Sequence, residues 1–216
     1  MESPVVVGHS WGTLAAQALA LADPAAARGL VLVSGYYYPT VRADALLVAP
    51  AAVPVLGDVL RHTISPLFGA ATLRLLLEGM FAPLPVPERF QQGFERGLAV
   101  RPLQIRAQAE DGTGMAREAA PMRDRYGELH LPVMIMAGSD DQVVDVGRHA
   151  IRLYQQIAHS ELRLVPGAGH MVHHAVPEQV ADMIEAVAKG HRLPGGPELE
   201  GTRPAGAHDR LAVAAE

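Results

Sequence analysis

The chain has 216 residues, of which 49% are hydrophobic and 19% are charged, and its formal net charge is -5. This composition is typical of a packed globular protein and argues against extensive disorder. The modest negative charge provides no basic surface, so neither nucleic acid nor an anionic membrane is expected as a partner. The absence of cysteine excludes disulfides and thiolate zinc sites. Because no signal-like segment is apparent either, we expect a cytoplasmic protein.

The first elements predicted along the chain are two strands separated by a helix. Val5–Val7 is a β-branched run that is typical of a buried strand, and Gly29–Val33 is a second one. Trp11–Ala22 consists largely of strong helix formers and ends before Pro24, which cannot continue a helix. The order strand, helix, strand predicts two parallel neighbours in one sheet.

The pattern changes between residues 36 and 120, where no strand is apparent. Helices are predicted there over Leu73–Met80 and Pro87–Leu98, so the segment is expected to be a helical insertion. All four phenylalanines of the chain lie in this insertion, and we expect them to pack in its core: Phe68, Phe81, Phe90 and Phe94.

Strands and helices alternate again in the last third of the chain. Strands are predicted over Leu131–Gly138 and Glu161–Val165, and a helix is predicted over Val146–Ala158. A final helix begins at Pro177, since a proline is well tolerated in a first helical turn. Its buried face is expected to carry Val180, Ile184, Val187 and Ala188.

These elements predict an α/β fold with a mostly parallel sheet and flanking helices. The expected core is formed by residues 1–35 and 121–189, and residues 36–120 are expected to form a helical cap. Residues 190–216 are rich in glycine, proline and charge and are expected to be a flexible tail.

The first chemical motif is Gly8-His9-Ser10-Trp11-Gly12, which has the form G-x-S-x-G and lies between a predicted strand and a predicted helix. In that context the chain turns sharply, so Ser10 is expected to be strained and to expose its hydroxyl above the sheet. A Cβ atom at either glycine is expected to clash with neighbouring backbone. An ordinary glycine-rich turn is the alternative interpretation.

A serine hydroxyl becomes a strong nucleophile only when a base takes its proton, and the base needs a carboxylate behind it. In a parallel sheet these groups are expected just after the carboxyl ends of later strands. One predicted strand is followed by a segment that contains Asp140, Asp141 and Asp145, and the next is followed by His170. His170 is therefore the candidate base, and the three aspartates are candidate acids.

These segments resemble the α/β-hydrolase superfamily. Residues 8–12 are similar to its nucleophile elbow, residues 138–144 to its acid loop of form G-x-x-D-x-V-V, and residues 167–170 to its histidine loop. The resemblance extends from residue 1 to about residue 189 and corresponds to the C-terminal part of that fold, from the elbow onward. It implies a triad of Ser10, Asp141 and His170.

The resemblance also implies an activity. A member of this family with a serine nucleophile is expected to hydrolyse carboxylic esters or related acyl compounds through an acyl-enzyme, with the Trp11 backbone N–H facing the oxyanion. A helical cap favours a small or medium apolar ester as substrate. No cofactor is expected. The other enzymatic possibilities are an acyltransferase, a C–C bond hydrolase and a prolyl-iminopeptidase-like peptidase.

Several nearby side chains have two interpretations. His9, Tyr36 and Tyr37 are candidates for the substrate pocket, although the tyrosines could equally pack in the core. His173 and His174 could form a metal site with His170, but no fourth ligand has a clear spacing, so no metal is expected.

One departure from the family pattern concerns the region before the elbow. The family has earlier strands there, and a loop after one of them supplies a second oxyanion N–H. Without them, the Val5–Val7 strand is expected to lie at an open edge that could pair with another strand or a second copy of the chain. One missing oxyanion donor costs about 100- to 1,000-fold in rate. A truncated, catalytically incompetent remnant or binding module is therefore the main alternative to an enzyme.

Overall fold

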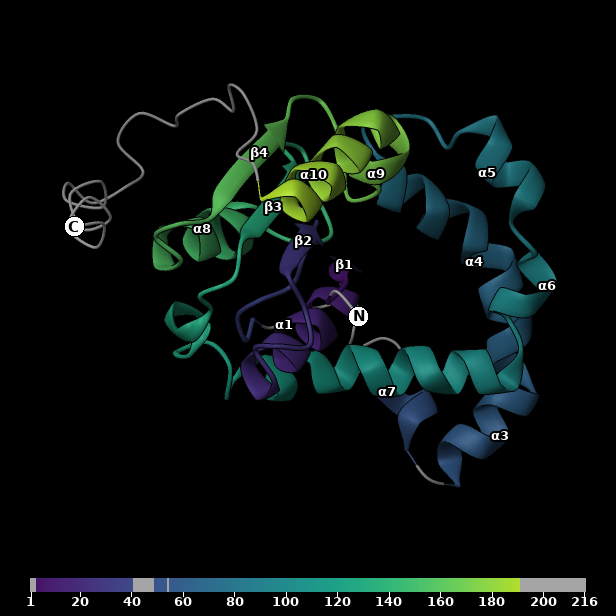
Figure 1. Cartoon of the computed structure of the whole chain (residues 1–216). Helices are drawn as coiled ribbons and strands as arrows, with labels where there is room; N and C mark the ends of the chain where they lie inside the picture. The colour runs from purple at the N-terminus through teal and green to yellow at the C-terminus, as the bar shows by residue number, and fades with distance from the viewer. Residues whose placement is uncertain (1–2, 41–48, 54, 191–216) are drawn as a thin grey trace, which may run out of the picture.

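The centre of the molecule is a four-stranded parallel sheet (Figure 1). The computed structural model describes residues 3–40, 49–53 and 55–190. The strands follow the order β1-β2-β3-β4 and comprise Val5–His9, Gly29–Val33, Val133–Gly138 and Glu161–Val165. Because His9 pairs with Val33 and Gly138 pairs with Val165, the carboxyl ends of the strands meet at one edge of the sheet. The predicted α/β fold class is confirmed.

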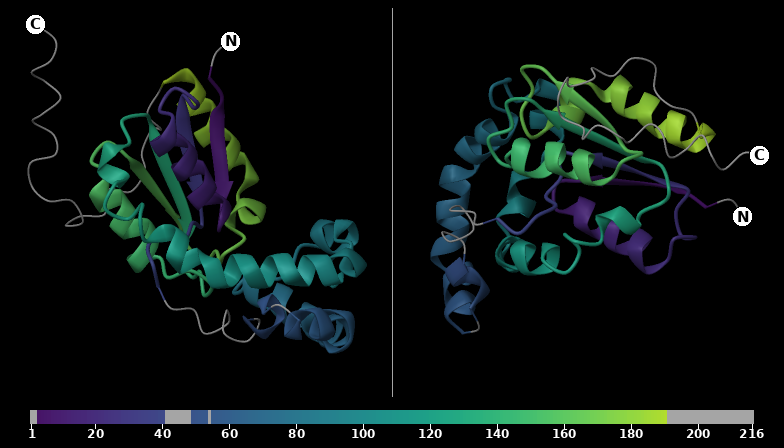
Figure 2. Two further views of the ribbon diagram at one scale, coloured as in Figure 1. Left: turned by 90° about the horizontal axis from the view of Figure 1, so that it is seen from below. Right: turned by 90° about the vertical axis from the view of Figure 1, so that its left-hand side faces the viewer.

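Helices cover both faces of the sheet (Figure 2). Helices α1 (Gly12–Ala22) and α8 (Arg152–Gln156) pack on one face, and α10 (Pro177–Lys189) packs on the other. Every residue of β2 and β3 is buried, which explains why these strands are continuous apolar runs. Alternate β2 side chains enter opposite cores: Leu30 and Leu32 on the α1 face, Val31 and Val33 on the α10 face.

Two helix ends follow directly from sequence signals. Helix α1 stops at Asp23, whose N–H donates to the Leu19 carbonyl, and Pro24 prevents further extension. Helix α10 begins at Pro177 and ends at Gly190, which has a φ of 66°. A left-handed residue closes the last helical turn, and glycine adopts this conformation without a Cβ penalty.

A second group of helices lies beyond the carboxyl edge of the sheet (Figure 2). Its two long members are α4 (Ile64–Phe81) and α7 (Pro102–Ala119). The shorter elements are a 3-10 turn and three helices: Ala49–Ala52, α3 (Leu56–His62), α5 (Glu88–Gly93) and α6 (Arg96–Ala99). The assignment of residues 36–120 as a cap remains a prediction, as does the flexible tail, because residues 191–216 lie outside the described residues.

Two local expectations for this helical group are wrong, and a third is confirmed with longer bounds. The helix expected over Pro87–Leu98 is broken into α5 and α6, because Gly93 is a weak helix former and Phe94 is extended. Phe68 is 67% exposed, so it does not join a packed core, whereas Phe81 is buried. The helix over Leu73–Met80 exists but begins at Ile64.

The segment after β3 also differs in detail from the expectation. The helix predicted over Val146–Ala158 is a π-helical turn, Gly147–Ile151, that continues into α8. Two shorter elements complete the described fold, a 3-10 turn at Tyr126–Glu128 and helix α9 at Val172–Ala175. On α10, Met183, Ala186 and Val187 form the buried stripe, and Val180 and Ile184 are partly buried beside it.

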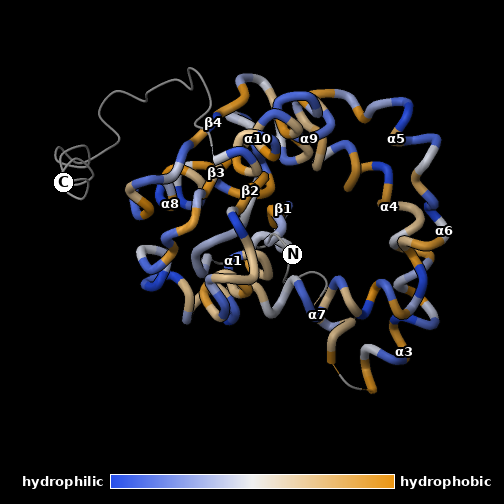
Figure 3. Tube along the Cα trace, in the orientation of Figure 1, coloured by the Kyte–Doolittle hydropathy of each residue, from blue (hydrophilic) through white to orange (hydrophobic). Residues whose placement is uncertain are grey.

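Helix α4 is the one helix in the described part of the chain that has the length and apolar composition to cross a membrane. Figure 3 shows its apolar stretches. Only 17% of its residues are buried. A single such helix is weak evidence for a membrane span, since core helices of soluble proteins pass the same test. The expected cytoplasmic location stays a prediction.

Strand β1 lies at the edge of the sheet, where it pairs with β2 alone. Val7 in this strand is 46% exposed. An edge strand leaves one row of backbone hydrogen-bonding groups open to another strand. The pairing of this edge with another strand or with a second copy of the chain therefore stays a prediction.

Candidate active site

The turn between β1 and α1 places Ser10 at the carboxyl edge of the sheet. Ser10 has a φ of 52°, a left-handed conformation that is rare outside glycine and costs on the order of 1–3 kcal/mol. Two contacts hold it there. Its N–H donates to the Val33 carbonyl at 3.0 Å, and its carbonyl accepts from the Thr13 hydroxyl at 2.7 Å. The expected strain at the serine is confirmed.

The two glycines of this turn have different roles. A Cβ atom on Gly8 would lie 2.8 Å from the Gly12 carbonyl oxygen and from Thr13 Cα, which is too close for backbone atoms. A Cβ atom on Gly12 would meet nothing within 4 Å. The expected clash is confirmed for Gly8 and wrong for Gly12, because the first turn of α1 leaves open space on that side.

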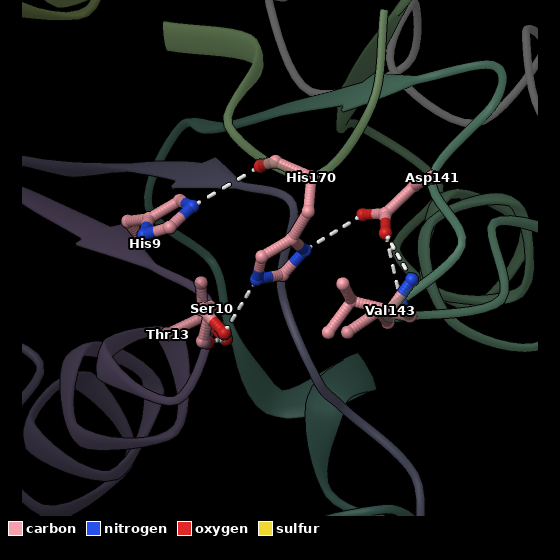
Figure 4. Close-up of polar contacts among 7 residues, drawn as sticks. His9, Ser10, Thr13, Asp141, Val143 and His170 are labelled. Carbon is pink, nitrogen blue, oxygen red and sulfur yellow. Dashed lines mark hydrogen bonds and ion pairs between the residues drawn. The ribbon is translucent and has the colours of Figure 1, made fainter. Parts of the chain in front are cut away.

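Ser10, His170 and Asp141 form a continuous hydrogen-bonded row (Figure 4). His170 Nε2 lies 2.9 Å from Ser10 Oγ, and His170 Nδ1 lies 2.8 Å from Asp141 Oδ2. A carboxylate only accepts hydrogen bonds, so the neutral imidazole carries its proton on Nδ1 and leaves Nε2 free to accept from the serine hydroxyl. The side chains of His170 and Asp141 are 2% and 1% exposed, so water is largely excluded from this pair.

The second carboxylate oxygen of Asp141 is also fixed. Asp141 Oδ1 accepts from the backbone N–H groups of Val143 and Val144 at 2.8 and 2.9 Å. The other two candidate acids are engaged elsewhere. Asp140 Oδ2 accepts from the Ser139 hydroxyl and the Gly167 N–H, and Asp145 Oδ1 accepts from the Arg148 N–H. Asp141 is therefore the aspartate that contacts His170.

The loop that carries His170 packs tightly against the end of α4. A Cβ atom on Gly169 would collide with the Ala82 carbonyl oxygen, so only glycine fits at this approach. The Met171 N–H donates to the Met80 carbonyl at 3.3 Å. The position of the histidine loop is thus linked directly to the helical group beyond the sheet.

Trp11 links the serine turn to the same helical group on another side. Its indole N–H donates to the Glu118 carboxylate on α7 at 3.3 Å, and the residue is 37% exposed. No pattern in the sequence predicts this contact, because 107 positions separate the two residues. The role of the Trp11 backbone N–H at an oxyanion stays a prediction.

Three further histidines form a row of ring contacts that begins at His170. The ring centroid of His9 lies 5.1 Å from that of His170 and 4.3 Å from that of His173, and His174 follows at 4.5 Å from His173. Burial, reinforced by the nearby imidazoles, lowers the pKa of both His9 and His173 to about 4. No group of three or more His, Cys, Asp or Glu side chains within the described residues could hold a metal ion.

The low pKa of His173 predicts a loss of stability in acid. An unfolded histidine takes up a proton near pH 6.5, whereas folded His173 does so only near pH 4. Between these values the unfolded state binds more protons, so the free energy of unfolding falls as the pH falls. We expect His173→Phe to lose less stability than wild type between about pH 7 and about pH 5. Urea unfolding at both pH values measures the free energy of unfolding of the two proteins. An equal decrease in wild type and in His173→Phe would contradict the prediction.

A cavity of about 240 Å³ lies beside the Asp141 end of the row. Its lining includes Tyr36, Thr40, Asp141, Val143 and Arg148. Tyr37 is not part of the lining, and its side chain is fully buried in the core. The pocket roles of His9, Tyr36 and Tyr37 stay predictions.

Ser10 is strained, follows the first strand of a parallel sheet and is hydrogen-bonded to a histidine, which in turn is hydrogen-bonded to an aspartate. These features define the class of α/β-fold proteins with a Ser-His-Asp site. The model of the alpha/beta hydrolase family matches residues 2–183. The chain therefore belongs to this family. Among curated protein sequences, none matches the chain.

Solved structures with the same fold are similar over most of this chain. An alpha/beta hydrolase fold protein from Burkholderia ambifaria is 22% identical, with a TM-score of 0.67, over 86% of this chain and 66% of its own. A thermophilic esterase is 25% identical, with a TM-score of 0.58, over 87% of this chain and 65% of the esterase chain. A third structure is a 2-hydroxy-6-oxo-6-phenylhexa-2,4-dienoate hydrolase from Rhodococcus sp. strain RHA1. It is 17% identical, with a TM-score of 0.63, over 87% of this chain and 64% of its own. The chain thus spans about two thirds of their length.

Proposed function

We propose that this chain is a serine hydrolase that cleaves carboxylic esters or related acyl compounds through an acyl-enzyme. The observation that carries the proposal is the hydrogen-bonded row from Asp141 through His170 to Ser10, with both links between 2.8 and 2.9 Å. In this order the carboxylate fixes the imidazole tautomer, and the imidazole is placed to remove the serine proton. The similarity to a thermophilic esterase supports an ester as the substrate.

Acylation begins when Ser10 Oγ attacks the acyl carbonyl carbon. His170 Nε2 takes the hydroxyl proton, and the negatively charged Asp141 stabilises the imidazolium that forms. The carbonyl oxygen becomes an oxyanion, which the Trp11 N–H at the start of α1 would bind. The tetrahedral intermediate then collapses. The bond to the leaving-group oxygen breaks, and His170 Nε2 donates its proton to that oxygen, so an alcohol leaves.

Deacylation uses the same groups with water as the nucleophile. His170 Nε2 removes a proton from water while the water oxygen attacks the acyl-serine carbonyl. When the second intermediate collapses, His170 returns this proton to Ser10 Oγ and a carboxylic acid leaves. The groups that act in these steps are the three side chains, the Trp11 backbone N–H and water. A small or medium apolar ester remains the expected substrate.

Two other functions are candidates for the same site. The similarity to the Rhodococcus dienoate hydrolase favours cleavage of a C–C bond by the same three residues. A chain that binds acyl ligands without turnover is the second candidate, and it would leave the edge strand β1, which pairs with β2 alone, open beside the site. Both functions would use the same loops at the carboxyl edge of the sheet.

A fluorophosphonate probe tests the proposal, because it reacts rapidly only with an activated serine. We expect the wild-type chain to gain the mass of one probe and peptide mapping to place it on Ser10. Ser10→Ala should gain none, and His170→Ala should react at least about 1,000-fold more slowly. Thr13→Ser, which keeps the hydroxyl that supports the turn, is the matched control and should label like wild type. A folded wild-type chain that gains no mass would refute the proposal and favour the binding function.

A further inference from the structure

We infer that His9 is a positioning residue that clamps the backbone of His170, an inference that rests on the proposed serine hydrolase function. His9 Nε2 lies 3.2 Å from the carbonyl oxygen of His170, although the two residues are 161 positions apart (Figure 4). The contact joins the last residue of β1 to the loop after β4, which are opposite edge strands of the sheet.

The clamp completes the fixation of His170. Ser10 and Asp141 each hold one ring nitrogen, and these two bonds define the plane of the imidazole. They do not act on the main chain of His170 itself, and the bond from the Met171 N–H to the Met80 carbonyl holds only the next residue of the loop. His9 supplies this third point of attachment, and it directly precedes Ser10 in the sequence. The same short segment therefore holds the nucleophile and sets its distance from the base.

The chemistry of His9 suits this role. A carbonyl oxygen only accepts, so His9 must carry a proton on Nε2. Burial, with a further contribution from His170, keeps the pKa of His9 near 4, so the donor is uncharged at neutral pH. Other ionisable groups also face His9: His174 disfavours its charge, Asp141 favours it, and the His173 ring lies 4.3 Å away. A permanently cationic donor here would oppose the imidazolium that His170 must form during catalysis.

The inference makes a specific prediction for two variants of His9. His9→Phe keeps an aromatic ring but removes the donor, so the loop can shift. We expect kcat to fall about 10- to 100-fold with little change in KM, because a small displacement of a catalytic group has effects of this size. His9→Gln places an amide N–H at the same distance along the side chain and should restore most of the lost kcat. His174→Phe, which changes a neighbouring ring in the same cluster, is the control and should retain wild-type kcat.

Two readouts separate positioning from a purely structural role. Urea unfolding reports the stability of each variant, and the downfield proton NMR resonance of the His170 Nδ1–H reports the bond to Asp141. We expect this resonance to broaden or move in His9→Phe and to return in His9→Gln. Wild-type kcat in folded His9→Phe, or an equal loss in His9→Gln at equal stability, would overturn the inference. If the wild-type chain does not react with the probe, the hydrolase proposal fails, while the NMR comparison still decides whether His9 clamps His170.

Discussion

Replacing Asp141 with asparagine is expected to lower kcat by about 10,000-fold while the fold is retained. The backbone N–H groups of Val143 and Val144 both donate to Asp141 Oδ1. In the variant, the amide oxygen must occupy this position, because an NH₂ group there would face two donors. The amide nitrogen then points at His170 Nδ1 and donates to it. The imidazole proton moves to Nε2, which can no longer accept the proton of Ser10.

Steady-state kinetics with a chromogenic ester measures this effect, and urea unfolding verifies that the variant is folded. Asp140→Asn is the matched control, since Asp140 is adjacent in sequence but binds the Ser139 hydroxyl and the Gly167 N–H instead. We expect its kcat to stay within about twofold of wild type, as for most surface substitutions. A large loss in Asp140→Asn and none in Asp141→Asn would mean that the wrong acid has been assigned.

The sequence predicts the sheet and the proximity of the three candidate residues well, because each depends on local signals. Apolar runs such as Gly29–Val33 are strands buried on both faces. Because the strands of a parallel sheet all run in one direction, the loops that follow them meet at one edge of the sheet. Ser10, Asp141 and His170 each follow a strand, so strand order alone brings them together. The choice among the three neighbouring aspartates depended on the family resemblance, and the hydrogen bonds of Asp141 now agree with it.

The helical group beyond the sheet was predicted less well, because its elements depend on tertiary packing. Helix α7 contains Gly112 and Gly114, which weaken its intrinsic helix propensity, and no helix was predicted there. Tertiary packing stabilises α7, because Ala109, Met115 and Ala119 are buried against the rest of the protein. The His9 clamp has no sequence signal at all, since a side-chain contact with a distant carbonyl leaves no pattern in residue spacing.

Gly8→Ala is expected to destabilise the protein by about 3 kcal/mol and to lower kcat by at least about 100-fold. The added methyl group would lie 2.8 Å from the Gly12 carbonyl oxygen and Thr13 Cα. These are backbone atoms at the start of α1, and they cannot rotate away as a flexible side chain would. Relief of the clash requires α1 to move away from β1. That movement would carry Ser10 with it, since the strained turn connects the two elements.

Gly12→Ala separates this effect from the general cost of adding a methyl group. The new Cβ would meet nothing within 4 Å, and Gly12 is the first residue of α1, where alanine is the better helix former. We therefore expect its free energy of unfolding to equal or exceed that of wild type, as measured by urea unfolding at neutral pH. Equal destabilisation by the two substitutions would show that the close approach at Gly8 does not determine the shape of the turn. In that case the strain at Ser10 would have to be maintained by its hydrogen bonds to Val33 and Thr13 alone.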